Sequence, residues 1–217
     1  MTDAVKRRAY DSSRRQDQAR ETRRGVLAAA RRLFLERGYA ATNMSTIATE
    51  AGVSVETVYK AFRNKPGLVK AVFDVAIAGD DEPVPMVERD MVQRINDEPD
   101  PARKLRIYAD HIASSSPRHV PVQLLVRDAA ASDAGAAEVW DQLLAERLTG
   151  MTLFAAHLQE SGSLRTGVSR DDAADLLWAY NSPELWDLLV LRRGWSAERF
   201  GDWVAAALGD ALLERDS

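Results

Sequence analysis

The sequence predicts an all-α protein in which an N-terminal unit of three helices precedes a larger helical bundle. Apolar residues recur at spacings of three and four in most segments, and capping residues recur between those segments. No segment alternates apolar and polar residues with β-branched enrichment, so no strand is expected. With 217 residues, 46% of them hydrophobic, the chain can bury a sizeable core.

The chain divides into three expected regions. Residues 1–17 are polar and rich in arginine, which predicts a flexible basic arm. Residues 18–79 form the expected N-terminal domain, and residues 84–217 form the expected helical body. The boundary lies in the segment GDDEPVP, because its glycine and prolines end the preceding helix.

The N-terminal domain begins with a helix whose apolar stripe ends near Arg37 and Gly38. Thr42 or Asn43 can cap the next helix, which ends at the turn AGVS. In that turn we expect Gly52 to adopt a left-handed conformation. Ser54 follows and can cap a further helix, Val55–Phe62. Two short helices joined by such a turn are typical of a helix-turn-helix unit.

The second helix of this unit separates its residues into two faces. Val58, Ala61 and Phe62 share the face expected in the core. The opposite face carries polar groups: Glu56, Lys60 and Arg63, flanked by Thr57 and Tyr59. A helix of this width fits the major groove of DNA. The alternative is an ordinary amphipathic helix whose polar face is solvated.

Charge is distributed unevenly along the chain. Residues 1–70 carry 15 Lys and Arg against 7 Asp and Glu, whereas the rest carries 14 against 26. A basic N-terminal region suits phosphate binding, and an acidic body is repelled by the duplex.

Several classes of function lack their sequence signals. The chain has no cysteine, its three histidines are scattered, and it contains no Walker loop or glycine-rich dinucleotide turn. We therefore expect no metal, no cofactor and no enzyme activity. No apolar run reaches the ~20 residues of a membrane helix, and no signal-peptide pattern is found. The expectation is a cytoplasmic protein without membrane contact.

The body reads as a succession of helices. One helix is expected over Lys65–Ala78, a long one from Gly135 to near Ser161, and a last one after Ser196. Other helices are expected to start at Asp100 and Pro101, at a capping box formed by Ser169 and Asp172, and at Ser182 and Pro183. A break is expected at Ser116 and Pro117.

Residues 20–78 resemble the DNA-binding domain of the TetR family of transcriptional regulators. The resemblance rests on GY, Thr42, IA, AGVS, TVY and the NK that precedes Leu68. It implies contacts to backbone phosphates from Thr42, Thr57, Tyr59 and Lys65, with a base also reached near Tyr59. The predicted DNA-binding residues are Thr42, Ser54, Val55, Glu56, Thr57, Tyr59, Lys60 and Lys65.

Glu56 departs from the family pattern, which often has glycine at this position. Its carboxylate can accept a hydrogen bond from a cytosine amino group. Alternatively, it is simply a carboxylate favourably placed at a helix N-terminus.

The resemblance further implies a homodimeric repressor that binds a palindromic operator in double-stranded DNA and is released by a small apolar effector. Dimerisation also has a physical argument, because five apolar residues cover much of one helix: Leu185, Trp186, Leu188, Leu189 and Val190. The alternative is that this helix is central to its own bundle.

Candidate ligand residues mix aromatic and polar groups on body helices: Tyr108, His111, Arg127, Trp140, Phe154 and Trp178. Two other functions remain open. One is a DNA-binding regulator without a small-molecule ligand, and the other is a helical protein-interaction module.

Overall fold

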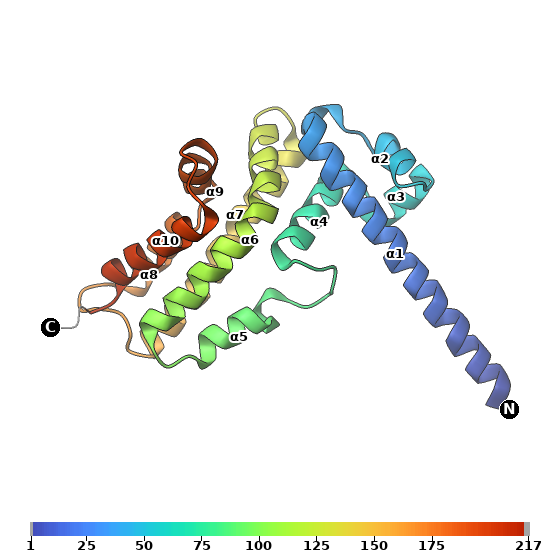
Figure 1. Ribbon diagram of the computed structural model, residues 1–217. Coiled ribbons are helices and arrows are strands. Elements are labelled where there is room, and N and C mark those ends of the chain that lie inside the picture. The colour runs from blue at the N-terminus through green and yellow to red at the C-terminus, as the bar shows by residue number, and fades with distance from the viewer. Residues whose placement is uncertain (1, 215–217) are drawn as a thin grey trace.

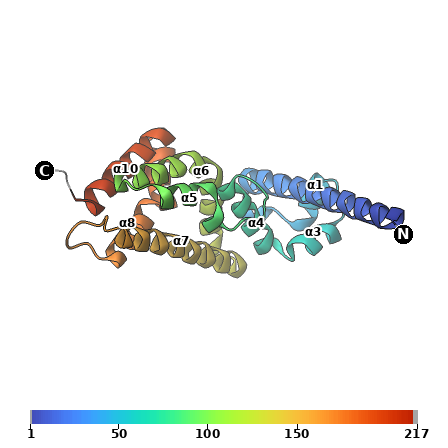
Figure 2. The same ribbon diagram turned by 90° about the horizontal axis from the view of Figure 1, so that it is seen from below.

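In a computed structural model, the protein is an elongated assembly of helices (Figures 1 and 2). The structure describes the backbone of residues 2–214 and the side chains of residues 17–214. Within that part of the chain every regular element is helical, which confirms the expected all-α class. Helices α1 to α4 form a head at one end, and α5 to α10 form the body.

The head consists of α1 (Thr2–Ala41), α2 (Met44–Glu50), α3 (Val55–Phe62) and α4 (Lys65–Ala78). The body consists of η1 (Met86–Glu88), α5 (Asp90–Asp97), α6 (Pro101–Ala130), α7 (Ala134–Glu160), α8 (Arg170–Tyr180), α9 (Pro183–Trp186), the π-helical segment η2 (Asp187–Arg192) and α10 (Ala197–Leu212).

The first helix is longer than the sequence pattern suggested. Its backbone is helical from Thr2, so the segment expected as a flexible arm continues α1. The side chains of residues 1–16 lie outside the described residues, and the role of the basic arm stays a prediction. Near the other end, Gly38 has φ 82° and ψ 164°, which interrupts the helix at the expected place.

Side-chain caps fix the turns of the head. The Asn43 side chain accepts a hydrogen bond from the Thr46 N–H at 2.8 Å at the start of α2. The Ser54 hydroxyl accepts from the Thr57 N–H at 3.2 Å at the start of α3. Between these helices Gly52 has φ 67°, as the turn requires. These contacts confirm the helix-turn-helix unit and its capping residues.

The turn from α3 to α4 is strained at Arg63. This residue has φ 66° and ψ −51°, and no other non-glycine residue in the described chain has positive φ. The Asn64 N–H reaches back to the Phe62 carbonyl at 2.7 Å, which makes Arg63 the centre of a tight γ-turn. The Asn64 side chain then caps α4 by accepting from the Gly67 N–H at 2.8 Å. The γ-turn leads the chain from α3 directly into the helix that reaches the body.

One sequence prediction for the body is wrong. The break expected at Ser116 and Pro117 does not occur, because α6 runs through both Pro117 and Pro121. The Arg118 guanidinium donates to the Ser114 carbonyl at 2.8 Å, and His119 Nδ1 lies 3.0 Å from the Ser115 carbonyl. These side chains bond to carbonyls in the turn where proline disturbs the backbone ladder.

Packing joins head and body through α4. The core of the head, which includes Leu33, Ile47 and Phe62, continues into buried residues of α6 and α7 such as Val122 and Leu143. A second core lies within α5 to α10. Arg118 on α6 also donates to the Ala76 carbonyl of α4 at 3.2 Å. The head is therefore packed against the body along α4.

The apolar helix expected near residue 185 lies beside the C-terminal part of α6, where Arg127 pairs with Glu184 at 3.7 Å (Figure 1). Trp186 is buried and packs edge-on against Phe200, with ring centroids 5.1 Å apart. Leu188 is 52% exposed and Leu191 is 54% exposed, whereas Leu185, Leu189 and Val190 are half-buried. One side of this helix therefore packs in the core of its own chain, and the other side leaves Leu188 and Leu191 exposed.

Candidate nucleic-acid interface and ligand cavity

Helix α3 presents one polar face to solvent. Val58 and Phe62 are buried, while Glu56, Thr57, Lys60 and Arg63 are exposed, and Tyr59 is 49% exposed. Val55 is half-buried, and Ala61, expected in the core, is instead exposed because it lies beside the polar face. The exposed face carries hydroxyl, ammonium, guanidinium and carboxylate groups, which are the groups that bind phosphates and base edges.

The start of α3 is organised by short-range bonds. Ser54 and Thr57 hydroxyls lie 3.1 Å apart, and both are exposed. Hydrogen bonds from its own backbone N–H and from the Ser54 hydroxyl lower the pKa of the Glu56 carboxyl. The carboxylate therefore fits the helix N-terminus in the free protein, as the simpler of its two interpretations expected.

Thr42 does not belong to this face. It is 1% exposed, and its hydroxyl lies 3.1 Å from the Leu33 carbonyl and 2.9 Å from the Gly38 carbonyl. The prediction that Thr42 contacts a DNA phosphate is therefore wrong, because its hydroxyl bonds to carbonyl groups at the end of α1. The accessible polar groups at the start of α2 are those of Asn43 and Ser45.

Lys65 lies at the junction of head and body. Its Nζ is 4.0 Å from the centroid of the Tyr39 ring, and the side chain is half-buried. Burial lowers the pKa of Lys65, and the negative charge of Asp133 partly opposes that shift. Burial, together with Asp133, raises the pKa of Tyr39 to about 12. Close packing continues beside it, since a Cβ on Gly135 would lie 2.5 Å from Pro66 Cγ.

A cavity of about 650 Å³ lies between the end of α4, the middle of α6 and the middle of α7. The loop after α4 and two arginines of α1 complete its lining. Of the predicted ligand residues, Tyr108 and His111 line this cavity. Its volume falls within the range typical of sites for small organic molecules, about 300–1,000 Å³.

The other four predicted ligand residues lie elsewhere. Arg127 pairs with Asp128 and Glu184, Trp140 packs against the core shared with the head, and Phe154 is buried against Tyr108. Trp178 is absent from the cavity lining, but its ring lies 4.7 Å from the Arg147 guanidinium carbon, and Arg147 does line the cavity. Periodicity alone could not distinguish a core aromatic residue from one that lines a void.

Sequence reasoning missed the polar residues that the cavity does gather. Ser115, His119 and Gln123 are buried on α6, and Arg147 reaches the cavity from α7. Burial lowers the pKa of His119 to about 4, so its ring is neutral near pH 7. The i, i+4, i+8 spacing of Ser115, His119 and Gln123 was the available signal, and the expected break at Pro117 obscured it.

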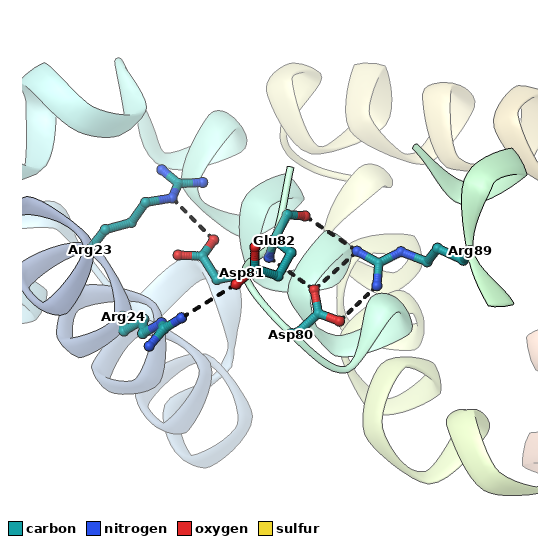
Figure 3. A network of polar contacts seen from close by, with 6 residues as sticks. All are labelled: Arg23, Arg24, Asp80, Asp81, Glu82 and Arg89. Atoms are coloured by element: carbon teal, nitrogen blue, oxygen red, sulfur yellow. Dashed lines mark hydrogen bonds and ion pairs between the residues drawn. The ribbon is translucent and has the colours of Figure 1, made fainter. Parts of the chain in front are cut away.

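Ion pairs tie the cavity loop to the head (Figure 3). Arg23 on α1 pairs with Asp81 at 3.3 Å, and Arg24 lies 4.0 Å from Glu82. On the other side, Arg89 pairs with Asp80 at 2.7 Å, and this bond lowers the pKa of the Asp80 carboxyl. The loop that borders the cavity is therefore held between α1 and the start of α5.

Comparison with known proteins identifies the head. Residues 26–72 match the family model described as bacterial regulatory proteins, tetR family. This match spans 47 of the 217 residues, all within the head. TtgR, an HTH-type transcriptional regulator of Pseudomonas putida, is 43% identical over 61 residues. That alignment covers 28% of this chain and 29% of TtgR, so it concerns the DNA-binding domain only.

Two solved structures share the fold over most of the chain. NalD, the secondary repressor of the MexAB-OprM multidrug efflux pump in Pseudomonas aeruginosa, has a TM-score of 0.69 at 20% identity, covering 92% of this chain and 100% of NalD. The SmeT–triclosan complex has a TM-score of 0.66 at 24% identity, covering 89% and 92% of the two chains. At these identities the likeness establishes the fold.

Two other kinds of site are not found among the described residues. No helix there is long and apolar enough to cross a membrane. In the same part of the chain, no group of three or more His, Asp or Glu residues is placed to hold a metal ion.

Proposed function

We propose that this protein is a homodimeric repressor that binds a palindromic operator through α3 and is released by a small molecule bound in the body. The single observation that carries the proposal is the exposed polar face of α3 on a capped helix-turn-helix, directly connected to a cavity through α4. In this role Tyr59, Lys60 and Glu56 face the base edges and phosphates of a major groove. Ser54, Val55 and Thr57 lie at the helix start, where backbone N–H groups favour a phosphate.

Lys65 contributes differently from the exposed residues of α3. Its ammonium packs on Tyr39, so we propose that it approaches phosphate from the edge of the head while bracing α4. Loss of its charge is expected to weaken binding to all DNA sequences and to reduce the salt slope by about one.

Dimerisation is proposed through the surface around η2. Leu188 and Leu191 are each more than half exposed, and a second copy could cover them. A two-fold axis there sets the separation of two recognition helices, which must be roughly 34–36 Å to reach successive major grooves.

Ligand control is supported by the position of the cavity. Its lining includes Phe73 and Val75 of α4 and Asp81 of the following loop, which pairs with Arg23 of the head. A molecule that moves these groups changes the position of the head relative to the dimer axis. The cavity favours this mechanism over a regulator without a ligand. Operator DNA and effector must then weaken each other's binding by the same factor.

Sedimentation of the full-length protein and of a Leu188→Asp, Leu191→Asp variant tests the dimer. We expect the unaltered protein to sediment as a dimer at micromolar concentration and the variant as a monomer with lost operator binding. Leu153→Asp is the matched control, because Leu153 is 55% exposed on α7, outside this surface. A monomeric unaltered protein, or a variant that remains dimeric, contradicts the proposed spacing mechanism.

A further inference from the structure

The cavity wall formed by α6 and α7 holds polar donors without strong acceptors, and Trp178 of α8 lies beside it, outside the lining. Arg147 donates through Nη1 to the Trp178 carbonyl at 2.5 Å, but its Nε is buried without a hydrogen-bond partner. The indole Nε1 of Trp178, beside the guanidinium, is likewise buried and unpartnered. Both atoms are donors only, so each lacks an acceptor.

Tyr108 adds a third donor to this wall. Its hydroxyl donates to the thioether sulfur of Met151 at 2.8 Å, and thioether sulfur is a weak acceptor. Burial raises the pKa of Tyr108, so the hydroxyl keeps its proton. An incoming oxygen anion is a better acceptor than the sulfur for this proton.

Arg147 differs from two other arginines that line the cavity, Arg23 and Arg89. Arg23 pairs with Asp81 and Arg89 with Asp80, whereas Arg147 has no carboxylate within ion-pair distance among the described residues. The acidic residues Asp74 and Glu146 are themselves paired with Lys70. Arg147 is half-buried, and a charge partly removed from water is costly without a partner. The wall at Arg147 is therefore the part of the cavity best suited to an anion.

The remaining lining is apolar enough to hold the rest of such a molecule. Phe73, Ile112, Leu143 and Met151 line the cavity together with Tyr108. Its volume of about 650 Å³ exceeds the needs of a bare inorganic ion.

We propose that the cavity binds an amphipathic organic anion, whose carboxylate is held by Arg147 and Tyr108 and whose apolar body packs on Phe73, Ile112, Leu143 and Met151. This inference rests on the proposed function only in treating the cavity as the effector site. It replaces a purely apolar effector by one that carries a single acidic group. The guanidinium and hydroxyl supply charge-assisted hydrogen bonds to the carboxylate.

The test is isothermal titration calorimetry of the full-length protein without DNA, using octanoate, 1-octanol, octylammonium and acetate as probes. Octanoate is expected to bind at least about tenfold more tightly than the other three, because only octanoate combines the negative charge with the apolar chain. This comparison needs no variant and therefore does not depend on the folding of a mutant.

Two substitutions test whether Arg147 binds the carboxylate of octanoate. Arg147→Met is expected to weaken octanoate binding at least about tenfold and to leave 1-octanol binding unchanged. Arg199→Met is the matched control, because Arg199 also lies over an indole ring, 4.0 Å from the centroid of Trp195, but is exposed and outside the cavity lining. Circular dichroism verifies that both variants fold, and Arg147→Lys is expected to retain part of the preference for octanoate.

Equal or tighter binding of 1-octanol or octylammonium overturns the inference, as does failure to bind octanoate or unchanged octanoate binding by folded Arg147→Met. A gel-shift titration of the same protein keeps the two proposals apart. Sequence-specific DNA binding without octanoate binding overturns the anion site alone. Octanoate binding without DNA binding overturns the proposed repressor alone.

Discussion

The Arg23 Nε in α1 lies 3.3 Å from Asp81 Oδ1 in the loop after α4, so the first helix of the head is bonded to the rim of the cavity. The two residues are 58 positions apart in the chain. The Arg23 guanidinium also lies 4.7 Å from the centroid of the Phe62 ring at the end of α3. One arginine therefore contacts both α3 and the loop that borders the cavity.

Removing this contact is expected to free the loop. Arg23→Gln should accelerate amide hydrogen exchange in residues 80–84, because their tie to α1 is lost. Since the Arg23 side chain is 39% exposed, the free energy of unfolding should fall by no more than about 1 kcal/mol. Arg103→Gln, which removes an exposed arginine paired with Asp100, is the control. Unchanged amide exchange in residues 80–84 of Arg23→Gln would show that the Arg23–Asp81 contact does not hold the loop.

The strained residue at the end of α3 gives a prediction about stability. Arg63→Gly should raise the free energy of unfolding by about 1 kcal/mol, because glycine adopts positive φ without the cost borne by a residue with a Cβ. Arg63→Ala removes the same guanidinium but keeps the Cβ, so it should give no gain. Urea unfolding measures both. Equal stability of the two variants would show that the γ-turn stores no strain.

Acid should destabilise the body through His119, which is buried, and through the half-buried His111 and His157. The pKa of His119 falls from 6.5 to about 4 on burial, and burial also lowers the pKa of His111 and of His157. The folded state then binds fewer protons than the unfolded chain below pH 6.5. The stabilisation is complete above that pH and declines as the pH falls toward 4, by up to about 3 kcal/mol from His119.

The measurement is denaturant unfolding of the full-length protein between pH 7 and pH 4, beside His119→Gln. The variant lacks the ring that must stay neutral, so its free energy of unfolding should depend less steeply on pH. If the free energy of unfolding depends on pH equally in the two proteins, His119 is not the source of the destabilisation by acid.

Local sequence signals predicted most of the fold because the residues that cap each helix lie next to it in the chain. Ser54, Asp100, Asp133 and Ser169 all accept hydrogen bonds from the first turns of the helices that follow them. The helix break predicted at Pro117 was wrong, because neighbouring side chains bond to carbonyls of the turn that proline disturbs and packing holds α6 together. Such compensation depends on tertiary contacts.

The sequence predicted the exposed face of α3 more completely than it predicted the lining of the cavity. The exposed face of α3 follows from periodicity within eight residues, whereas the burial of Thr42 depends on how α1 ends. Arg147 was missed because an arginine on an amphipathic helix is normally solvated. Its unpartnered Nε becomes evident only when α6, α7 and α8 are packed together.

Whether α3 binds a specific DNA sequence is tested by selecting bound duplexes from a random DNA library, followed by gel-shift titration of the enriched sequence. We expect a palindromic site with half-sites about one helical turn apart, bound with a Kd near 10⁻⁸ M or lower at roughly physiological salt. Tyr59→Ala and Lys60→Ala on the exposed face of α3 should each weaken binding at least about tenfold, whereas Lys70→Ala, on the half-buried side of α4, should not. Failure to enrich any sequence, or full affinity in both α3 variants, would contradict DNA reading by this helix.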